Sequence, residues 1–271
     1  MSKDRPISSG TEKYRLGTHP VSGVGYGFSE KEFEQAITGS VVLTVFDNHG
    51  NASVADFLLS LNTTGFSAES VHRILHQNSL PENWRVGEAF AETYLVQHRS
   101  CVFPWSDSRD ERRQNSSLPG ADLVGFQIDG KSYRFAFGEV KTSHQKKYPP
   151  DVLYGRSGMT AQVEDLCSTR STRDTLVKYL IFREKSLSKD DASRLRFASQ
   201  QYLENSDNCT IFGVLIRDVE PHKNDLCTRV DFFIAAKHPK EMVIELIAIY
   251  LPAGQIDTLG DTVQKARGGA A

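Results

Sequence analysis

Three features of the sequence predict an α/β protein with a mixed central sheet flanked by helices. The chain has 271 residues, of which 39% are hydrophobic and 24% charged, and this composition is typical of a globular protein with a substantial core. Helix-like and strand-like patterns alternate along the chain. Two strand-like runs meet at Asp129-Gly130, and Asp-Gly between alternating apolar residues is a strong hairpin signal.

We expect three parts: an N-terminal α/β subdomain over residues 1–82, a core over residues 83–252 and a C-terminal tail over residues 253–271. In the first part, the β-branched run 41–46 predicts a buried strand. Residues 54–61 and 67–77 predict helices, and Ser67 is a typical capping residue for the second.

The core is expected to begin with a helix over residues 81–98 and a polar loop over 106–120. The hairpin strands follow at 122–128 and 133–142, and residues 148–158, rich in Pro and Gly, predict a loop. The remaining expected elements are helices over 159–169, 173–184 and 190–203, strands over 210–217 and 229–236, and a closing helix over 241–250.

Charge and cysteine content exclude several classes of protein. There are 32 Lys and Arg residues against 34 Asp and Glu residues, so overall positive charge cannot hold this chain on nucleic acid, and any contact must come from a local patch. Four cysteines without a CxxC pair exclude a zinc ribbon and suggest reduced thiols. The N-terminus lacks the apolar segment of a signal peptide and no apolar run is long enough to span a bilayer, so we expect a cytoplasmic protein without membrane contact.

Asp122 and the Glu139-Val140-Lys141 sequence are the most informative residues. If the hairpin turns at Asp129-Gly130, Asp122 lies opposite Phe137 and diagonal to Glu139. Diagonal Cβ atoms are roughly 7–8 Å apart, a gap that two carboxylates and one metal ion can fill. Lys141 shares this face because side chains alternate along a strand. The alternative is a structural ion pair at the sheet edge, and a second match, Asp129-Gly130-Lys131, is explained by the turn itself.

These residue types suit metal-dependent hydrolysis of a phosphodiester. Carboxylate oxygens of Asp122 and Glu139 favour a hard cation such as Mg²⁺, with Mn²⁺ as an alternative. Such an ion neutralises the scissile phosphate and helps to deprotonate the attacking water. The Lys141 ammonium can hold that water and stabilise developing charge.

A further acid is expected from the helix over residues 81–98. Glu88 and Glu92 are four residues apart and share one helix face, so either could complete the metal shell. Gly87, Ala89 and Ala91 would let the helix approach the sheet closely beside Glu88, which favours Glu88. The alternative is a solvated acidic stripe, and we favour that interpretation for Glu92.

Basic residues gather just after the Glu-x-Lys strand. Lys146, Lys147 and Arg156 form a local positive cluster in a nearly neutral chain, and we expect them to contact phosphates. Gln162, near the start of the next helix, is a further candidate for nucleic-acid binding. The alternative for the basic cluster is an ordinary solvated loop.

Taken together, Glu88, Gly120-Ala121-Asp122, the Phe137-to-Ser143 string and Gln162 resemble the PD-(D/E)xK nuclease superfamily over roughly residues 83–185. The resemblance implies a restriction-endonuclease-like core in which the Asp and the Glu-x-Lys lie on two strands of a hairpin. It also implies a Glu from the preceding helix and a Gln or Lys from the following one. Pro119 is displaced from the Pro-Asp position that names the superfamily.

A closer resemblance is to the HamA-type nucleases of Hachiman antiphage defence systems. It is carried by Gly-Glu-Val-Lys-Thr-Ser at 138–143, by the loop at 154–159 and by an additional N-terminal subdomain. The resemblance implies bacterial antiviral defence and a partner helicase, HamB, that restrains the nuclease and releases it onto DNA.

The leading hypothesis from the sequence is therefore a Mg²⁺-dependent DNA endonuclease. One alternative is a site-specific restriction endonuclease, and another is a non-catalytic subunit that keeps a nuclease-like fold to bind a helicase or DNA. A formal net charge of -2 predicts modest, salt-sensitive affinity for DNA, which fits a nuclease whose access to DNA depends on a partner.

Overall fold

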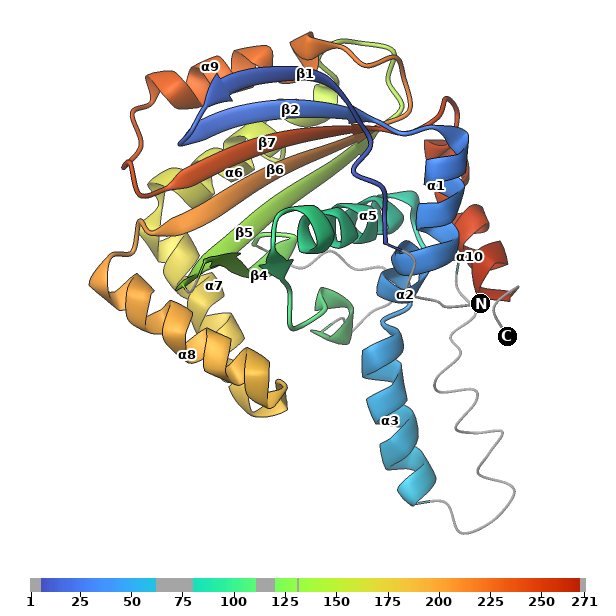
Figure 1. The fold of residues 1–271 in the computed structure, drawn as a ribbon, viewed down its shortest axis with the longest axis vertical. Coiled ribbons are helices and arrows are strands. Elements are labelled where there is room, and N and C mark those ends of the chain that lie inside the picture. The colour runs from blue at the N-terminus through green and yellow to red at the C-terminus, as the bar shows by residue number, and fades with distance from the viewer. Residues whose placement is uncertain (1–5, 62–79, 111–119, 131, 269–271) are drawn as a thin grey trace.

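The computed structural model describes residues 6–61, 80–110, 120–130 and 132–268, and these form an α/β protein around one seven-stranded mixed sheet (Figure 1). The strand order across the sheet is β1 (Thr11–Thr18), β2 (Val21–Gly27), β7 (Val243–Tyr250), β6 (Cys209–Arg217), β5 (Ser132–Ser143), β4 (Leu123–Asp129) and β3 (Cys101–Val102). Strands β2, β7, β6 and β5 run parallel, whereas β1, β4 and β3 pair antiparallel with their neighbours.

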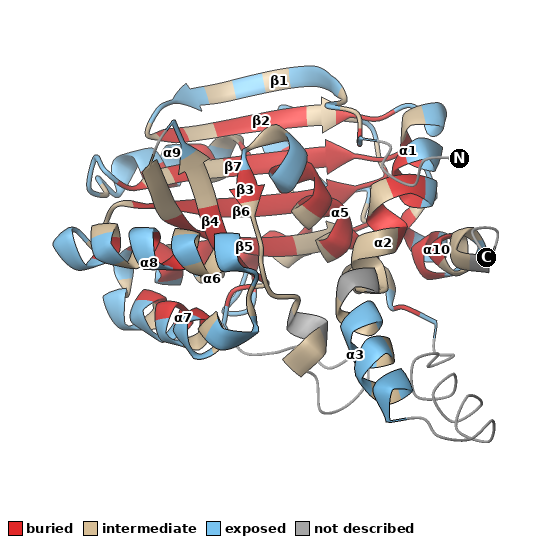
Figure 2. Cartoon of the chain, turned by 60° about the horizontal axis from the view of Figure 1, so that its bottom comes forward, coloured by how far each residue is buried: buried red, intermediate tan, exposed pale blue. Residues whose placement is uncertain are grey.

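The central strands are buried along almost their whole length. Every residue of β6 is buried, and so are six of the eight residues of β7. Parallel strands covered on both faces consist of continuous apolar runs, and the sequences CTIFGVLIR and VIELIAIY fit that pattern. Figure 2 shows buried residues concentrated in these strands and on the inner sides of the helices.

Helices cover both faces of the sheet. One face carries α6 (Met159–Ser168), α7 (Arg170–Phe182), α8 (Lys189–Glu204) and α9 (Cys227–Ala235). The opposite face carries α1 (Glu30–Ala36), a π-helical turn (Ile37–Val41), α2 (Val42–Val45), α5 (Asn83–His98) and α10 (Leu259–Gly268). Helix α3 (Asn48–Ser60) points away from the sheet (Figure 1). Short 3-10 turns lie at Asp107–Asp110, Asp151–Leu153, Glu184–Ser186, Lys223–Asp225 and Ile256–Thr258.

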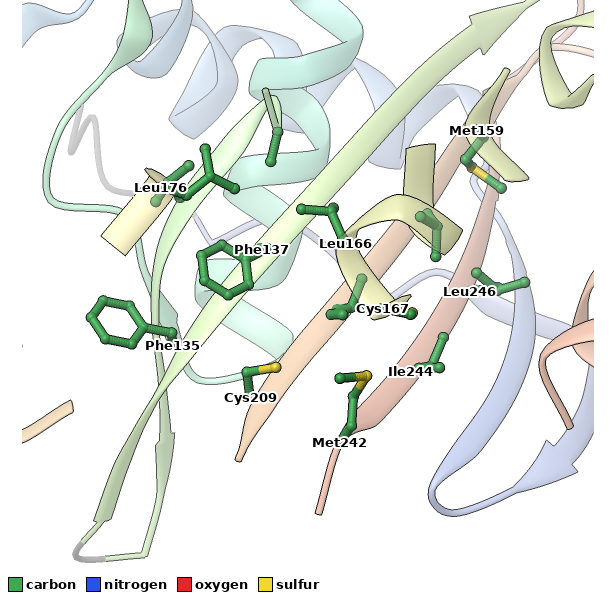
Figure 3. Packing of buried hydrophobic residues seen from close by; sticks show 14 of the residues in the cluster. Phe135, Phe137, Met159, Leu166, Cys167, Leu176, Cys209, Met242, Ile244 and Leu246 are labelled. Atoms are coloured by element: carbon green, nitrogen blue, oxygen red, sulfur yellow. The ribbon is translucent and has the colours of Figure 1, made fainter. Parts of the chain in front are cut away.

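Strand β5 contributes side chains to the core on both faces of the sheet. Its odd-numbered residues Phe135 and Phe137 stack with ring centroids 6.0 Å apart and belong to the cluster beneath α6, α7 and α8 (Figure 3). Its even-numbered Ala136 and Val140 belong to the cluster beneath α5 on the other face. This alternation assigns every later residue of β5 to one face or the other.

Three predicted elements have the other secondary structure. Residues 41–46, expected as a strand, lie in the π-helical turn and α2. Residues 229–236, expected as a strand, belong to helix α9, and the expected closing helix 241–250 is strand β7. Short apolar runs do not distinguish a buried helix from a buried strand, so packing decides. The helix expected over 67–77 lies outside the described residues.

The helices predicted over 81–98, 159–169, 173–184 and 190–203 and the strand over 210–217 are confirmed within a few residues. The expected division at residue 82 does not coincide with a break in the sheet, because β2 pairs with β7. The expected tail 253–271 contains α10, whose Leu259 and Val263 are buried. Within the described ranges, no helix is both long and apolar enough to cross a membrane.

Candidate active site

The hairpin of β4 and β5 brings Asp122 and Glu139 together, in a register that differs from the expected one. Asp129 pairs with Ser132 and Val124 with Phe137, so the pairing is shifted by two residues. Gly130 adopts a φ of +61°, which is accessible to glycine at little cost, and it comes first in the turn instead of second. A shift of two keeps each side chain on its expected face. Asp122, one residue before β4, therefore lies directly opposite Glu139 and not diagonal to it.

Asp122 is held in place by the neighbouring strand. Its Oδ2 accepts a hydrogen bond of 2.7 Å from the main-chain N–H of Val140. Burial raises the pKa of Asp122, although this hydrogen bond and the charge of Lys141 act in the opposite direction. The carboxyl group is thus fixed at the margin of the sheet, where β4 begins and where β3 no longer covers it.

Glu139 is the most deeply buried acid of the candidate site. Its side chain is 1% exposed and one oxygen, Oε1, accepts a hydrogen bond from the Lys141 ammonium. The other oxygen, Oε2, is buried and receives no hydrogen bond from an N–H or hydroxyl donor among the described residues. The side chains of Glu139 and Asp122 are hydrogen-bonded to each other when one of the two carboxyl groups carries a proton. Burial, together with the nearby charge of Asp122, raises the pKa of Glu139 to about 8. The charges of Lys141 and Arg85 both act on Asp122, and Arg85 is also paired with Glu88. The three acids Asp122, Glu139 and Glu88 therefore exceed these two cations by one negative charge when all three acids are ionised.

Glu88 approaches from the opposite face of the sheet. Helix α5 contacts β5 closely, since a Cβ on Gly87 would lie 2.1 Å from Oγ1 of Thr142. Glu88 pairs with Arg85 at 3.2 Å, and both side chains are less than one-fifth exposed. A small polar pocket beside α5 is lined by Arg85, Glu88, Glu92, Ser106 and Asp122, together with Thr44, Val45, Ala89 and Leu123.

Glu88 lines the same pocket as Asp122 but does not form a three-acid group with Asp122 and Glu139. Among the residues that the structure describes, no three Asp, Glu, His or Cys side chains gather closely enough to hold one metal ion. Glu88 and Glu92 both line the pocket that Asp122 reaches. The structure therefore brings together Asp122, Glu139 and Lys141, and places Glu88 at the wall of an adjoining pocket, with Arg85 as its counter-ion.

The predicted nucleic-acid-binding residues lie on the surface beyond β5. Lys146, Lys147 and Arg156 are exposed, and Lys147 pairs with Asp151. Both partners of that pair are more than half exposed, and exposed ion pairs contribute little, so phosphate can replace Asp151 at small cost. The three cations are exposed, and no contact between them and the carboxylate pair is seen in the described part of the chain.

Gln162 is half-buried on α6, the helix that packs on β5 and β6. Its Oε1 is buried and makes no hydrogen bond to the described part of the chain. Leu166, one helical turn later, lies close to Phe137 (Figure 3). Because Glu139 follows Phe137 on the same face of β5, Gln162 belongs to the helix side that covers the carboxylates.

Two arginines with clear structural roles were not predicted from the sequence. Arg85 precedes Glu88 by three residues on α5, and this i, i+3 spacing of opposite charges was the available signal. Arg217 ends the otherwise uncharged strand β6, and a single charge in a buried strand signals a specific partner. Comparison with models of known protein families and with curated proteins gives no match for this chain.

Proposed function

We propose that the chain is a metal-dependent nuclease that hydrolyses phosphodiester bonds in DNA. One observation carries the proposal: the half-buried Asp122 and the buried Glu139 face each other closely enough to share a proton, and only Glu139 is bonded to the Lys141 ammonium. Buried charge of this kind requires a proton or a cation.

The residues present fit a divalent cation. Carboxylate oxygens are the ligands that Mg²⁺ and Mn²⁺ accept most readily. Glu139 Oε2 receives no hydrogen bond from an N–H donor of the described residues, so an ion would replace only the proton that Glu139 and Asp122 share. Asp122 and Glu139 would hold the ion, and the pocket beside Asp122 offers Glu88 as an outer neighbour. When bound, such an ion neutralises phosphate charge and lowers the pKa of a bound water.

The chain's own residues supply the remaining functions. Val140 N–H holds the Asp122 carboxylate in one orientation. Lys141 is the ammonium nearest to the acids and is 24% exposed, so it can donate to a water or a phosphate oxygen and stabilise developing negative charge. Gln162 and the exposed Lys146, Lys147 and Arg156 are the proposed contacts to the DNA backbone.

The experiment that tests this proposal compares two double variants. Glu139→Ala with Lys141→Ala should abolish plasmid degradation in Mg²⁺. Asp129→Ala with Lys131→Ala alters the other acid-x-Lys sequence of the same hairpin and should leave degradation unchanged. Undiminished cutting by the first purified variant would reject the assignment.

The products and the partners separate the rival proposals. Defined fragments instead of a smear would favour a site-specific restriction endonuclease. Metal binding without cleavage of any DNA or RNA substrate would favour a non-catalytic interaction subunit. The resemblance at residues 138–143 and 154–159 supports an effector of bacterial antiphage defence under a HamB-like helicase, and that proposal predicts that the helicase suppresses cleavage until DNA is added.

A further inference from the structure

Arg217 is a fully buried charge at the end of β6. Its side chain is 0% exposed, and it is the one charged residue in the strand sequence CTIFGVLIR. In the parallel register it pairs with Ser143, the last residue of β5. A buried guanidinium is costly unless it is paired and hydrogen-bonded, so its partners indicate what it does.

The first partners of Arg217 belong to the basic loop, residues 144–150, which directly follows β5. Nη2 of Arg217 donates hydrogen bonds to the main-chain oxygens of Gln145, at 2.8 Å, and of Lys147, at 3.0 Å. Its guanidinium also lies over the ring of Tyr148, 5.4 Å from the centroid. Arg217 is therefore hydrogen-bonded to the main chain on both sides of Lys146. In this segment the side chains of Lys146 and Lys147 are exposed to solvent.

The second set of partners anchors Arg217 to the rest of the fold. Asp225, also fully buried, lies 3.7 Å from Nε of Arg217. Oδ2 of Asp225 accepts a hydrogen bond of 2.8 Å from the hydroxyl of Tyr250, which is in turn 2.8 Å from the hydroxyl of Tyr14. These contacts include residues of β1 and β7. Through the Arg217 side chain, the basic loop is therefore connected to β6, β7 and β1.

The Arg217–Asp225 ion pair contributes little to the stability of the fold. Nε and Nη1 of Arg217 and Oδ1 of Asp225 make no hydrogen bonds to the residues that the structure describes. Buried ion pairs with incomplete hydrogen bonding contribute little to stability, because desolvation offsets their attraction. The role of the pair is instead to fix geometry. It holds the main chain of the basic loop next to β5, the strand that carries Lys141.

We propose that Arg217 is a positioning residue for DNA binding: it fixes the main chain of residues 145–147 so that Lys146 and Lys147 meet the phosphate backbone beside the carboxylate pair. The inference rests on the proposed function for its ligand, DNA. Arg217 itself contacts no substrate, so its effect must act through the two lysines.

The test measures DNA affinity without cleavage. Arg217→Lys keeps the charge but cannot reproduce the forked contacts of a guanidinium. Binding of a fluorescein-labelled duplex, and of its single strand, is followed by anisotropy in EDTA. We expect about tenfold weaker binding and a salt dependence reduced by up to about two phosphate contacts. Turnover at saturating DNA in Mg²⁺ should change far less than affinity.

Arg173 provides a matched control. It is also buried, donates to the main-chain oxygens of Leu166 and Cys167 at 2.8 and 2.7 Å, and pairs with Asp207 at 2.8 Å. These contacts secure the junction of α6 and α7, away from the basic loop. Arg173→Lys should therefore lower thermal stability without the selective loss of DNA affinity.

A double-variant cycle separates positioning from a general structural effect. In a background that carries Lys146→Ala and Lys147→Ala, Arg217→Lys should have almost no further effect on affinity, because the groups it positions are gone. Three results would each overturn the inference. Arg217→Lys could weaken DNA binding just as much in that background as in the wild type, Arg173→Lys could weaken it equally, or Arg217→Lys could bind DNA with wild-type affinity. If Arg217→Lys does not fold, Tyr250→Phe, which releases Asp225, should give a smaller loss with the same dependence on the lysines.

The two proposals fail in different ways. If the wild-type chain binds DNA but never cuts it, the nuclease proposal fails and the cycle still decides the role of Arg217. If the chain cuts DNA and Arg217→Lys binds normally, only the role of Arg217 is rejected. If neither probe binds to the wild-type chain, positioning for DNA is rejected, and the plasmid assay judges the nuclease proposal separately.

Discussion

The ammonium of Lys141 contacts one carboxylate oxygen of Glu139, whereas the other oxygen of Glu139 is buried and receives no hydrogen bond from an N–H donor in the described part of the chain. Asp122 lies opposite, and the charges of Lys141 and Arg85 both act on it, while Arg85 is also paired with Glu88. The three acids therefore exceed the two cations by one charge. This imbalance should make the site sensitive to protons and to divalent metal ions, and it leads to the first two predictions below.

The first prediction concerns pH and stability in the metal-free protein. Burial and the charge of Asp122 raise the pKa of Glu139 from 4.5 to about 8. Between these values the folded state holds a proton that the unfolded state has released, so this group's contribution to stability is present at low pH and is lost as pH rises to about 8. The loss should amount to a few kcal/mol at most. Thermal unfolding in EDTA across this range measures it.

Glu139→Gln is the matched variant for that measurement, because an amide keeps the shape and does not titrate. Its unfolding temperature should fall less than that of the wild type as pH rises through the same window. Asp122 interacts with Glu139, so the two acids titrate as a pair, and some pH dependence from Asp122 should remain. Parallel pH profiles for variant and wild type would show that Glu139 is not the titrating group.

The second prediction separates metal binding from chemistry. Lys141→Met removes the ammonium that competes for Glu139, so affinity for Mn²⁺ or Mg²⁺ should be equal to or higher than that of the wild type. DNA cleavage should nevertheless drop by at least about a hundredfold, because transition-state charge loses its donor. Calorimetry in the absence of DNA measures the affinity. Glu139→Gln should lose both properties, and loss of metal binding by Lys141→Met would contradict this account.

The third prediction ranks the acids. Asp122 and Glu139 face each other, whereas Glu88 lies at the pocket wall with Arg85. We expect Asp122→Asn to lower cleavage by about a thousandfold or more, and Glu88→Gln by only about tenfold. Glu92→Gln is the control from the same helix face. A Glu88→Gln loss as large as that of Asp122→Asn would place Glu88 among the direct metal ligands.

The fourth prediction concerns the contact between α5 and β5. An added Cβ at Gly87 would lie 2.1 Å from Oγ1 of Thr142, so Gly87→Ala forces either the Thr142 side chain or helix α5 to shift. Overpacking of this kind costs about 1–3 kcal/mol, and denaturant unfolding will measure it. Thr142→Ala in the same chain should recover part of the loss. Additive effects of the two changes would show that they do not share this contact.

Local patterns in the sequence predicted the hairpin and the face of its side chains, because strand alternation and the Asp-Gly signal are local properties. They did not predict its register. Gly130 takes a left-handed conformation one place earlier in the turn than expected. The expected and the observed pairing registers differ by two residues, so both keep the same side chains on the same face. Only packing of the whole sheet distinguishes them, so Asp122 opposite Glu139 had to come from the structure.

The errors in secondary structure have a similar cause. The run 243–250 is apolar enough for a buried helix or a buried strand, and its neighbours β2 and β6 make it a strand. Residues 41–46 favour strand by propensity, but burial against α5 and α10 keeps them helical. Arg217 was not predicted because its partners, the loop oxygens and Asp225, become neighbours only when three strands align.

The pairing of β2 with β7 has a consequence for the synthesis of the chain. Val21 is aligned with Ile244, a residue 223 positions later, so β1 and β2 can pair with each other early, whereas the second edge of β2 waits until β7 has been made. Pairings between such distant segments form late and slowly. The β4–β5 hairpin with its acids is made before its supporting strands, since β6 follows only after α6, α7 and α8, and β7 follows after α9. Emergence of the chain from the ribosome therefore sets a delay before the acids acquire their burial, and a chain broken off before β7 leaves unpaired strand edges open to aggregation.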